Sequence, residues 1–178
     1  MSLFGKSSTR KKKTQTVSYV PAKEFERGKP PGLRYFLLFK EYKRLSDLAI
    51  KYSNARLNRA ADSYYDESER LVRRWIERNN KGHDYEREGK ISLAIKQYEK
   101  NVEDMCYLPA SYQRLRVIYT KRKHFDEALR VCRAYLKFLD AIGDMGLHSS
   151  LDKAALRKQF EGWCTKLESK LEKEKSPN

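Results

Sequence analysis

Apolar side chains recur every three or four residues along most of this chain, which is the period of an amphipathic α-helix. In the first half the pattern runs over residues 38–52 and again over 61–75, with no proline between them. Either one long helix or a hairpin of two fits 33–80. The hairpin is favoured, because uncapped helices beyond about 25 residues are uncommon in compact domains. The candidate positions for the break are Asn54, Asn58 and Asp62.

Turn-forming residues divide the rest of the chain more clearly. Gly89 separates two helical runs, and Pro109 begins the next, since proline is tolerated in a first helical turn. A turn at 123–124 precedes a helix that ends near Ala141. A loop at 143–150 follows, and Ser149 or Ser150 is expected to cap a last amphipathic helix. No stretch alternates as a strand does, so the predicted fold class is all-α.

Two alanines, Ala94 and Ala128, lie inside apolar helix faces 34 residues apart. Helices approach each other closely where one side chain is small, so both alanines are expected to be tightly packed. A repeat starting at Trp75 has small, aromatic and turn-forming residues at matching intervals. They are Gly82, Tyr85, Gly89, Ala94 and Tyr98. A second repeat, starting at Pro109, keeps Tyr119 and Ala128. It departs from the pattern at Arg116, Lys123 and Cys132.

This pattern resembles the tetratricopeptide repeat over about residues 75–142. The resemblance implies a short right-handed stack of antiparallel helical hairpins, with the last helix as a C-terminal cap. Ala60 and Tyr64 fit a degenerate earlier repeat. The predicted organisation is a helical domain at 33–178 preceded by a flexible basic tail at 1–32, which ends in a turn at 28–32.

The resemblance also implies a concave face, lined by the first helix of each hairpin, where such arrays bind their partners. The candidate partner-binding residues on that face are Asn79, Asn80, His83, Arg87, Gln113, Arg114, Val117 and Lys121. Arg87, Arg114 and Lys121 are its cations, and Arg114 is expected to face solvent, free to hold a carboxylate. The alternative is a solvated polar face that binds nothing.

The formal net charge of +15 is concentrated in residues 1–32 and in the basic segment 110–142. Such an excess attracts acidic peptides and nucleic acids alike. We therefore expect a non-enzymatic scaffold or adaptor that binds an acidic peptide or helix in the concave groove. The alternative is a nucleic-acid-binding protein that uses the segment 110–142 and the basic tail. The tail's cluster is Arg10, Lys11, Lys12 and Lys13.

Residues suited to catalysis or metal binding do not cluster in this sequence. The three histidines and three cysteines lack metal-ligand spacing, and no glycine-rich phosphate loop is present. We expect no catalytic residue, metal or cofactor. Unpaired cysteines favour a reducing compartment, and the longest apolar run, 35–39, is far too short to span a membrane. The expected location is the cytoplasm, or the nucleus in a eukaryote; the sequence specifies neither the partner nor the oligomeric state.

Overall fold

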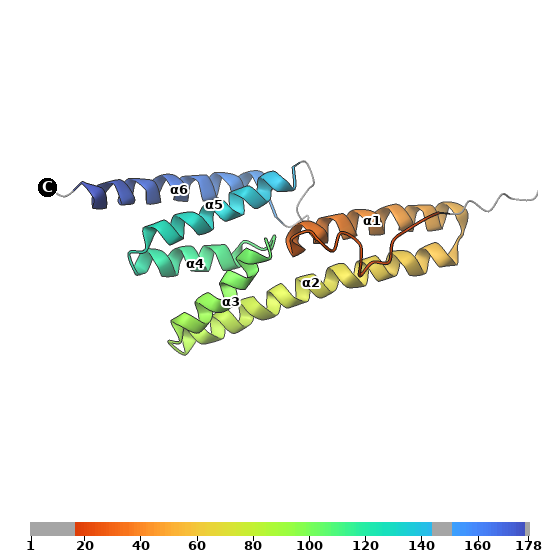
Figure 1. Ribbon diagram of the computed structural model, residues 1–178, viewed down its shortest axis with the longest axis horizontal. Helices are drawn as coiled ribbons and strands as arrows, with labels where there is room; N and C mark the ends of the chain where they lie inside the picture. Colours follow the sequence, from red (N-terminus) through yellow and green to blue (C-terminus); the bar gives the residue numbers. More distant parts are fainter. Residues whose placement is uncertain (1–16, 144–150, 177–178) are drawn as a thin grey trace, which may run out of the picture.

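The computed structural model describes residues 17–143 and 151–176, and every regular element within these ranges is an α-helix. The helices pack as sequential antiparallel neighbours in an elongated arrangement (Figure 1). They are α1 (Pro31–Tyr52), α2 (Ala55–Arg87), α3 (Ile91–Glu103), α4 (Ala110–Lys121), α5 (Phe125–Ala141) and α6 (Lys153–Lys175). The all-α prediction is confirmed.

The first two helices form the hairpin that the apolar pattern favoured. Ser53 ends α1 in the left-handed conformation, with φ at 48°. The side chain of Asn54 then caps α2, accepting hydrogen bonds from the backbone amides of Arg56 at 3.0 Å and Leu57 at 3.3 Å. These interactions satisfy amides that have no partner inside the helix. The break therefore lies at Asn54.

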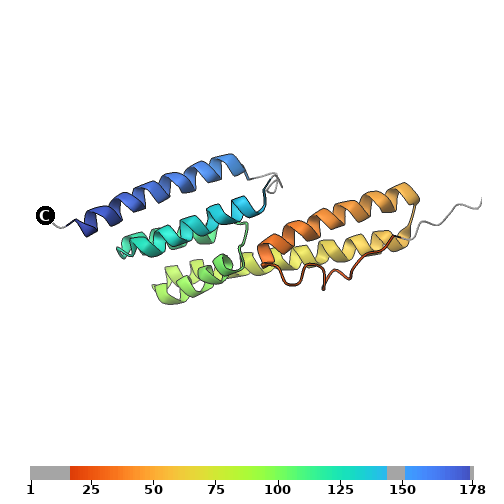
Figure 2. The same cartoon turned by 45° about the horizontal axis from the view of Figure 1, so that its top comes forward.

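Helix α2 is longer than the sequence pattern indicated, with 33 residues and no interruption. Its N-terminal part packs against α1 and its C-terminal part against α3 (Figure 2). The degenerate repeat expected at Ala60 and Tyr64 is thus not separated by a turn from the repeat that starts at Trp75. Between Tyr64 and Trp75 there is no glycine or proline, and Leu71 continues the buried face, so nothing ends the helix there.

The small residues pack as the sequence predicted. Ala94 and Ala128 are completely buried. Gly82 lies against the ring of Tyr98 so closely that a Cβ atom on the glycine would be 2.4 Å from its Cε1. The turns after α2 and α4 use left-handed residues, Gly89 with φ at 71° and Lys123 with φ at 61°. Lys123 thus adopts the backbone conformation of the glycine in the first repeat.

An aromatic cluster joins the start of α1 to the other helices. The rings of Tyr35 and Tyr107 stack with centroids 4.9 Å apart, and Trp75 meets Tyr35 edge-on at 6.0 Å. Phe36 contacts Phe138 of α5 at 6.0 Å. Aromatic contacts of this kind stabilise a core beyond the area that they bury. The α1–α2 hairpin and the α3–α6 helices therefore share one hydrophobic core.

Residues 17–30 lie against α1 and α2, although the sequence placed them in a flexible tail. The buried Arg34 donates hydrogen bonds to the carbonyls of Ala22, Lys23 and Phe25, all at 2.9 Å, and forms an ion pair with Glu67 at 2.8 Å. Buried backbone carbonyls need such donors. The helical domain therefore has an N-terminal extension that is part of the fold, and α1 begins at Pro31 rather than after the turn at 28–32.

The last helix begins at Lys153 and packs along α5. Its N-cap is Asp152, whose carboxylate accepts hydrogen bonds from the amides of Ala154 at 2.9 Å and Ala155 at 3.0 Å. The expected caps, Ser149 and Ser150, lie outside the described residues and precede the cap position. An aspartate is the stronger choice here because its negative charge also interacts favourably with the helix dipole.

Candidate partner-binding face

The residues predicted to line a concave face lie on the C-terminal part of α2 and on α4. The exposed side chains of Asn80, His83 and Arg87 line a shallow depression on α2. Arg87 forms an ion pair with Asp84 on the same helix, and both side chains are largely exposed. Such a surface pair contributes little to stability. These three residues are therefore accessible to a partner.

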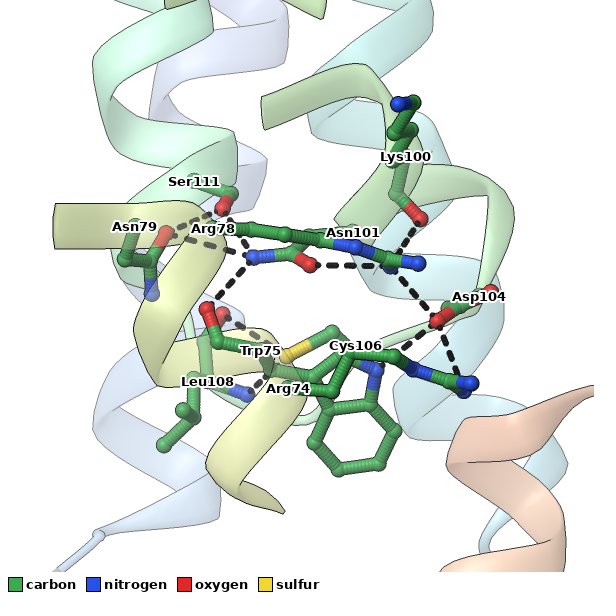
Figure 3. Close-up of polar contacts among 10 residues, drawn as sticks. All are labelled: Arg74, Trp75, Arg78, Asn79, Lys100, Asn101, Asp104, Cys106, Leu108 and Ser111. Carbon is green, nitrogen blue, oxygen red and sulfur yellow. Dashed lines mark hydrogen bonds and ion pairs between the residues drawn. The ribbon is translucent and has the colours of Figure 1, made fainter. Parts of the chain in front are cut away.

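Asn79 is not available on this face, contrary to the sequence-based expectation. It is buried, and its side-chain oxygen accepts hydrogen bonds from the Ser111 hydroxyl and from Asn101 Nδ2 at 3.4 Å (Figure 3). The reason is the rotation of α2, which turns this position toward α3 and α4. Asn79 thus satisfies buried polar groups inside the fold.

The polar cluster in Figure 3 links three helices and the loop after α3. Asn101 Nδ2 donates to the Trp75 carbonyl and to Ser111 Oγ, both at 3.0 Å. Next to it, Asp104 accepts from Trp75 Nε1 at 3.0 Å and from Arg78 at 2.7 Å. Asn101 is completely buried, and these hydrogen bonds, with one that its Oδ1 accepts from Arg78, satisfy its amide. The central polar groups of this cluster are hydrogen-bonded to one another, so the cluster stabilises the fold and is not a binding site.

Arg114 is held in place by Glu86, also contrary to expectation. Its Nε donates to Glu86 Oε1 at 2.9 Å, and a second nitrogen forms a very short contact with Oε2, while the Tyr98 hydroxyl donates to Oε1 at 2.8 Å. Burial opposes ionisation of Glu86, but the hydrogen bonds from Arg114 and Tyr98 outweigh it and lower the pKa of this carboxyl. Arg114 therefore links α4 to α2 and is not a free cation.

A groove runs along α4, and we call it the α4 groove. It consists of two adjoining cavities, of about 270 Å³ and 160 Å³, which share Arg114 and Val117. The larger cavity lies between α4 and α6 and is completed by Gln113, Arg116, Gln159 and Trp163. The smaller lies toward the end of α4 and is completed by Glu86, Ile91, Ile118, Lys121 and Arg122. Predicted residues Gln113, Arg114, Val117 and Lys121 therefore come together here.

The α4 groove combines apolar walls with an excess of positive charge. Its cations are Arg114, Arg116, Lys121 and Arg122, and its acidic residue is Glu86. Lys121 and Arg122 are exposed, and no carboxylate among the described residues lies within ion-pair distance of either. Apolar walls with unpaired cations are suited to an acidic segment that also carries apolar side chains.

Arg116 and Trp163 line the larger cavity but were not among the predicted site residues. The Arg116 guanidinium lies over the Trp163 ring, 4.0 Å from its centroid, in a cation–π contact. Burial lowers the pKa of Arg116, and its Nε has no hydrogen-bond partner within residues 17–143 and 151–176. One signal was available, because Arg116 occupies a position where the repeat pattern has a small residue. That Trp163 faces it was not evident from either helix alone.

The other sequence-based expectations concern charge and chemistry. Arg10, Lys11, Lys12 and Lys13 lie outside the described residues. In the basic segment 110–142, Arg130 pairs with Glu99 at 2.6 Å and Arg133 with Glu168 at 2.8 Å, so part of its charge is neutralised internally.

Within 17–143 and 151–176, no three residues of metal-binding type are grouped as a site would require. The three cysteines are free and buried, and burial raises the pKa of Cys132 to about 12. The described helices include none with the length and apolarity that a membrane crossing demands. Comparison with protein-family models, with curated proteins and with solved structures found no match.

Proposed function

We propose that this chain is a non-enzymatic interaction module, a scaffold or adaptor, that binds an acidic peptide or helix in the α4 groove. The observation that carries the proposal is the charge of Lys121 and Arg122, which no carboxylate of the described helices pairs with, beside the apolar side chains of Ile91, Val117 and Ile118. An acidic segment with apolar residues would neutralise these two cations and cover these apolar side chains.

We further propose that the helical hairpins stack in the right-handed manner of the tetratricopeptide repeat. Three features support this: the contact of Gly82 with Tyr98, the complete burial of Ala94 and Ala128, and the left-handed turn at Gly89. In such a stack α4 is the first helix of the second hairpin and faces the concave side. We place the protein in the cytoplasm, since its buried cysteines are free thiols.

The test uses a fluorescently labelled peptide with Leu and Glu at helical spacing, blocked at both ends, and a control peptide with Gln at every Glu. We expect wild-type protein to prefer the Glu peptide. The double variant Lys121→Glu, Arg122→Glu should lose that preference, because both unpaired cations become anions. The single reversal Lys121→Glu, which should weaken that preference, has a charge-matched control in Lys137→Glu, an exposed residue on α5 outside the groove, which should bind like wild type. Fluorescence anisotropy measures the affinities.

The rival class is nucleic-acid binding through the basic segment and the tail. It predicts that the chain binds a nucleic-acid duplex with an affinity that falls steeply with salt, as counterion release requires. Equal binding of the Glu and Gln peptides, together with salt-sensitive duplex binding that Lys121→Glu and Lys137→Glu weaken alike, would reject the groove proposal.

A further inference from the structure

Three polar atoms on one side of α4 have no hydrogen-bond partner in the described parts of the chain. They are the hydroxyl of Tyr112, Nε of Arg116 and the hydroxyl of Thr120. The three residues are four positions apart, so they form one line along the helix. Tyr112 and Arg116 both contact α6, through the rings of Phe160 and Trp163. Buried polar groups usually have partners, so these three atoms are exceptions, and two of them belong to residues that contact α6.

Arg116 is the member of this line that lines an open cavity, whereas Tyr112 is completely buried. The guanidinium of Arg116 lies over the Trp163 ring, 4.0 Å from its centroid, and this cation–π contact restricts where the group can point. The remaining polar side chains of the cavity are Gln113 and Gln159, which are neutral, and Arg114, which Glu86 already neutralises.

Other arginines nearby have carboxylate partners. Arg114 pairs with Glu86, Arg130 with Glu99, and Arg133 with Glu168. Arg116 has none among the described residues, although it is more shielded from water than an ordinary surface arginine. A guanidinium that has lost part of its hydration gains more from a carboxylate than an exposed one does.

We propose that Arg116, oriented by Trp163, is the anchor of the α4 groove and binds the side-chain carboxylate of an aspartate or glutamate in the partner. This proposal rests on the function proposed above and names the residue that recognises the acidic group. The groove continues from this cavity to Lys121 and Arg122, so acidic residues further along the same segment meet the remaining cations. That continuity favours an internal acidic residue over a chain terminus.

The experiment measures binding of the blocked Glu peptide to the full chain carrying Arg116→Gln, Arg116→Lys or Trp163→Phe. The control Lys137→Gln removes one positive charge from outside the groove. Arg116→Gln should weaken binding about tenfold or more, since a hydrogen-bonded charge is lost. Arg116→Lys should be intermediate, because an ammonium has neither the planar fork nor the stacking of arginine. Near-ultraviolet circular dichroism confirms that each variant is folded.

Tryptophan emission gives a second readout. Trp75 is completely buried and Trp163 only partly, so the peptide should change the emission of Trp163. The change should be absent in Trp163→Phe even at peptide concentrations that saturate the protein. This separates contact at the anchor from a general loss of positive charge.

The outcomes distinguish this proposal from the one on which it rests. If the wild type binds the Glu peptide, but Arg116→Gln behaves like Lys137→Gln and tryptophan emission is constant, the anchor is wrong and the groove stands. If the wild type does not prefer the Glu peptide to the Gln peptide, both proposals are wrong. The assignment to an internal acidic side chain is overturned if the affinity depends on Arg116 only when the peptide has a free C-terminus. It is also overturned if a nucleic-acid duplex displaces the peptide in an Arg116-dependent manner.

Discussion

Gly82 and Gly162 allow the close packing of α2 on α3 to be measured with the same substitution at two sites. Both are helical, in α2 and α6. A Cβ atom at Gly82 would lie 2.4 Å from Cε1 and 2.5 Å from Cζ of Tyr98, whereas a Cβ at Gly162 would have no neighbour within 4 Å. The substitutions Gly82→Ala and Gly162→Ala therefore add the same methyl group to a crowded position and to an open one.

Two opposing effects set the expected magnitudes. Alanine is favoured over glycine inside a helix by about 0.8–1.0 kcal/mol, and this gain applies at both positions. At Gly82 the Tyr98 ring cannot easily move away, because it is completely buried and its hydroxyl is bonded to Glu86 at 2.8 Å. Such overpacking costs about 1–3 kcal/mol. We expect Gly162→Ala to stabilise the protein by up to about 1 kcal/mol and Gly82→Ala to destabilise it by up to about 2 kcal/mol.

Urea denaturation of the two variants measures the difference in unfolding free energy. Tyr98→Leu alone and Tyr98→Leu combined with Gly82→Ala complete a double-mutant cycle. Gly82→Ala should cost less when the ring is absent. Equal stabilisation by both alanines, or no coupling between positions 82 and 98, would show that α2 and α3 do not meet at this glycine.

Two further predictions concern ionised groups. Asp104→Asn should destabilise the fold by about 1–3 kcal/mol in urea denaturation, because Asp104 and its partner Arg78 are both mostly shielded from water. A double-mutant cycle with Arg78→Met should show coupling between the two positions. Additive losses of stability would contradict the ion pair. Glu86→Gln tests the lowered pKa of Glu86. The stabilisation from this carboxylate is present above its ordinary pKa and is lost as pH falls through the lowered value. The stability difference between wild type and variant should therefore shrink on acidification. A difference that does not change with pH would refute the assignment.

Features that depend on local sequence were predictable, and features that depend on helix pairing were not. Gly89 and Pro109 mark helix ends through backbone conformation alone, so both boundaries were found. Ala94 and Ala128 were identified because a small residue in an apolar face has a direct packing reason. The continuity of α2 was missed. The polar stretch between Tyr64 and Trp75 interrupts the apolar pattern, but it contains no glycine or proline that would end a helix.

The candidate site shows the same division. Asn79 and Arg114 were assigned to the surface from their position in a repeat pattern, but whether a polar side chain is free depends on its neighbours. Asn79 meets Ser111, and Arg114 meets Glu86, across contacts between helices distant in sequence. Arg116 and Trp163 were missed for the corresponding reason, since each is an ordinary residue until α4 and α6 are placed side by side.

The uninterrupted helix α2 has a consequence for how this protein unfolds. In most arrays of helical hairpins a loop separates each unit from the next, so one unit can open while its neighbours stay folded. Here α1 and α3 pack on two parts of a single helix, and the amide of Gly32 also bonds to the Asp104 carbonyl at 2.7 Å. Opening either hairpin exposes the helix that supports the other. Hydrogen exchange should therefore report one cooperative unit from α1 to α3, rather than two that open independently.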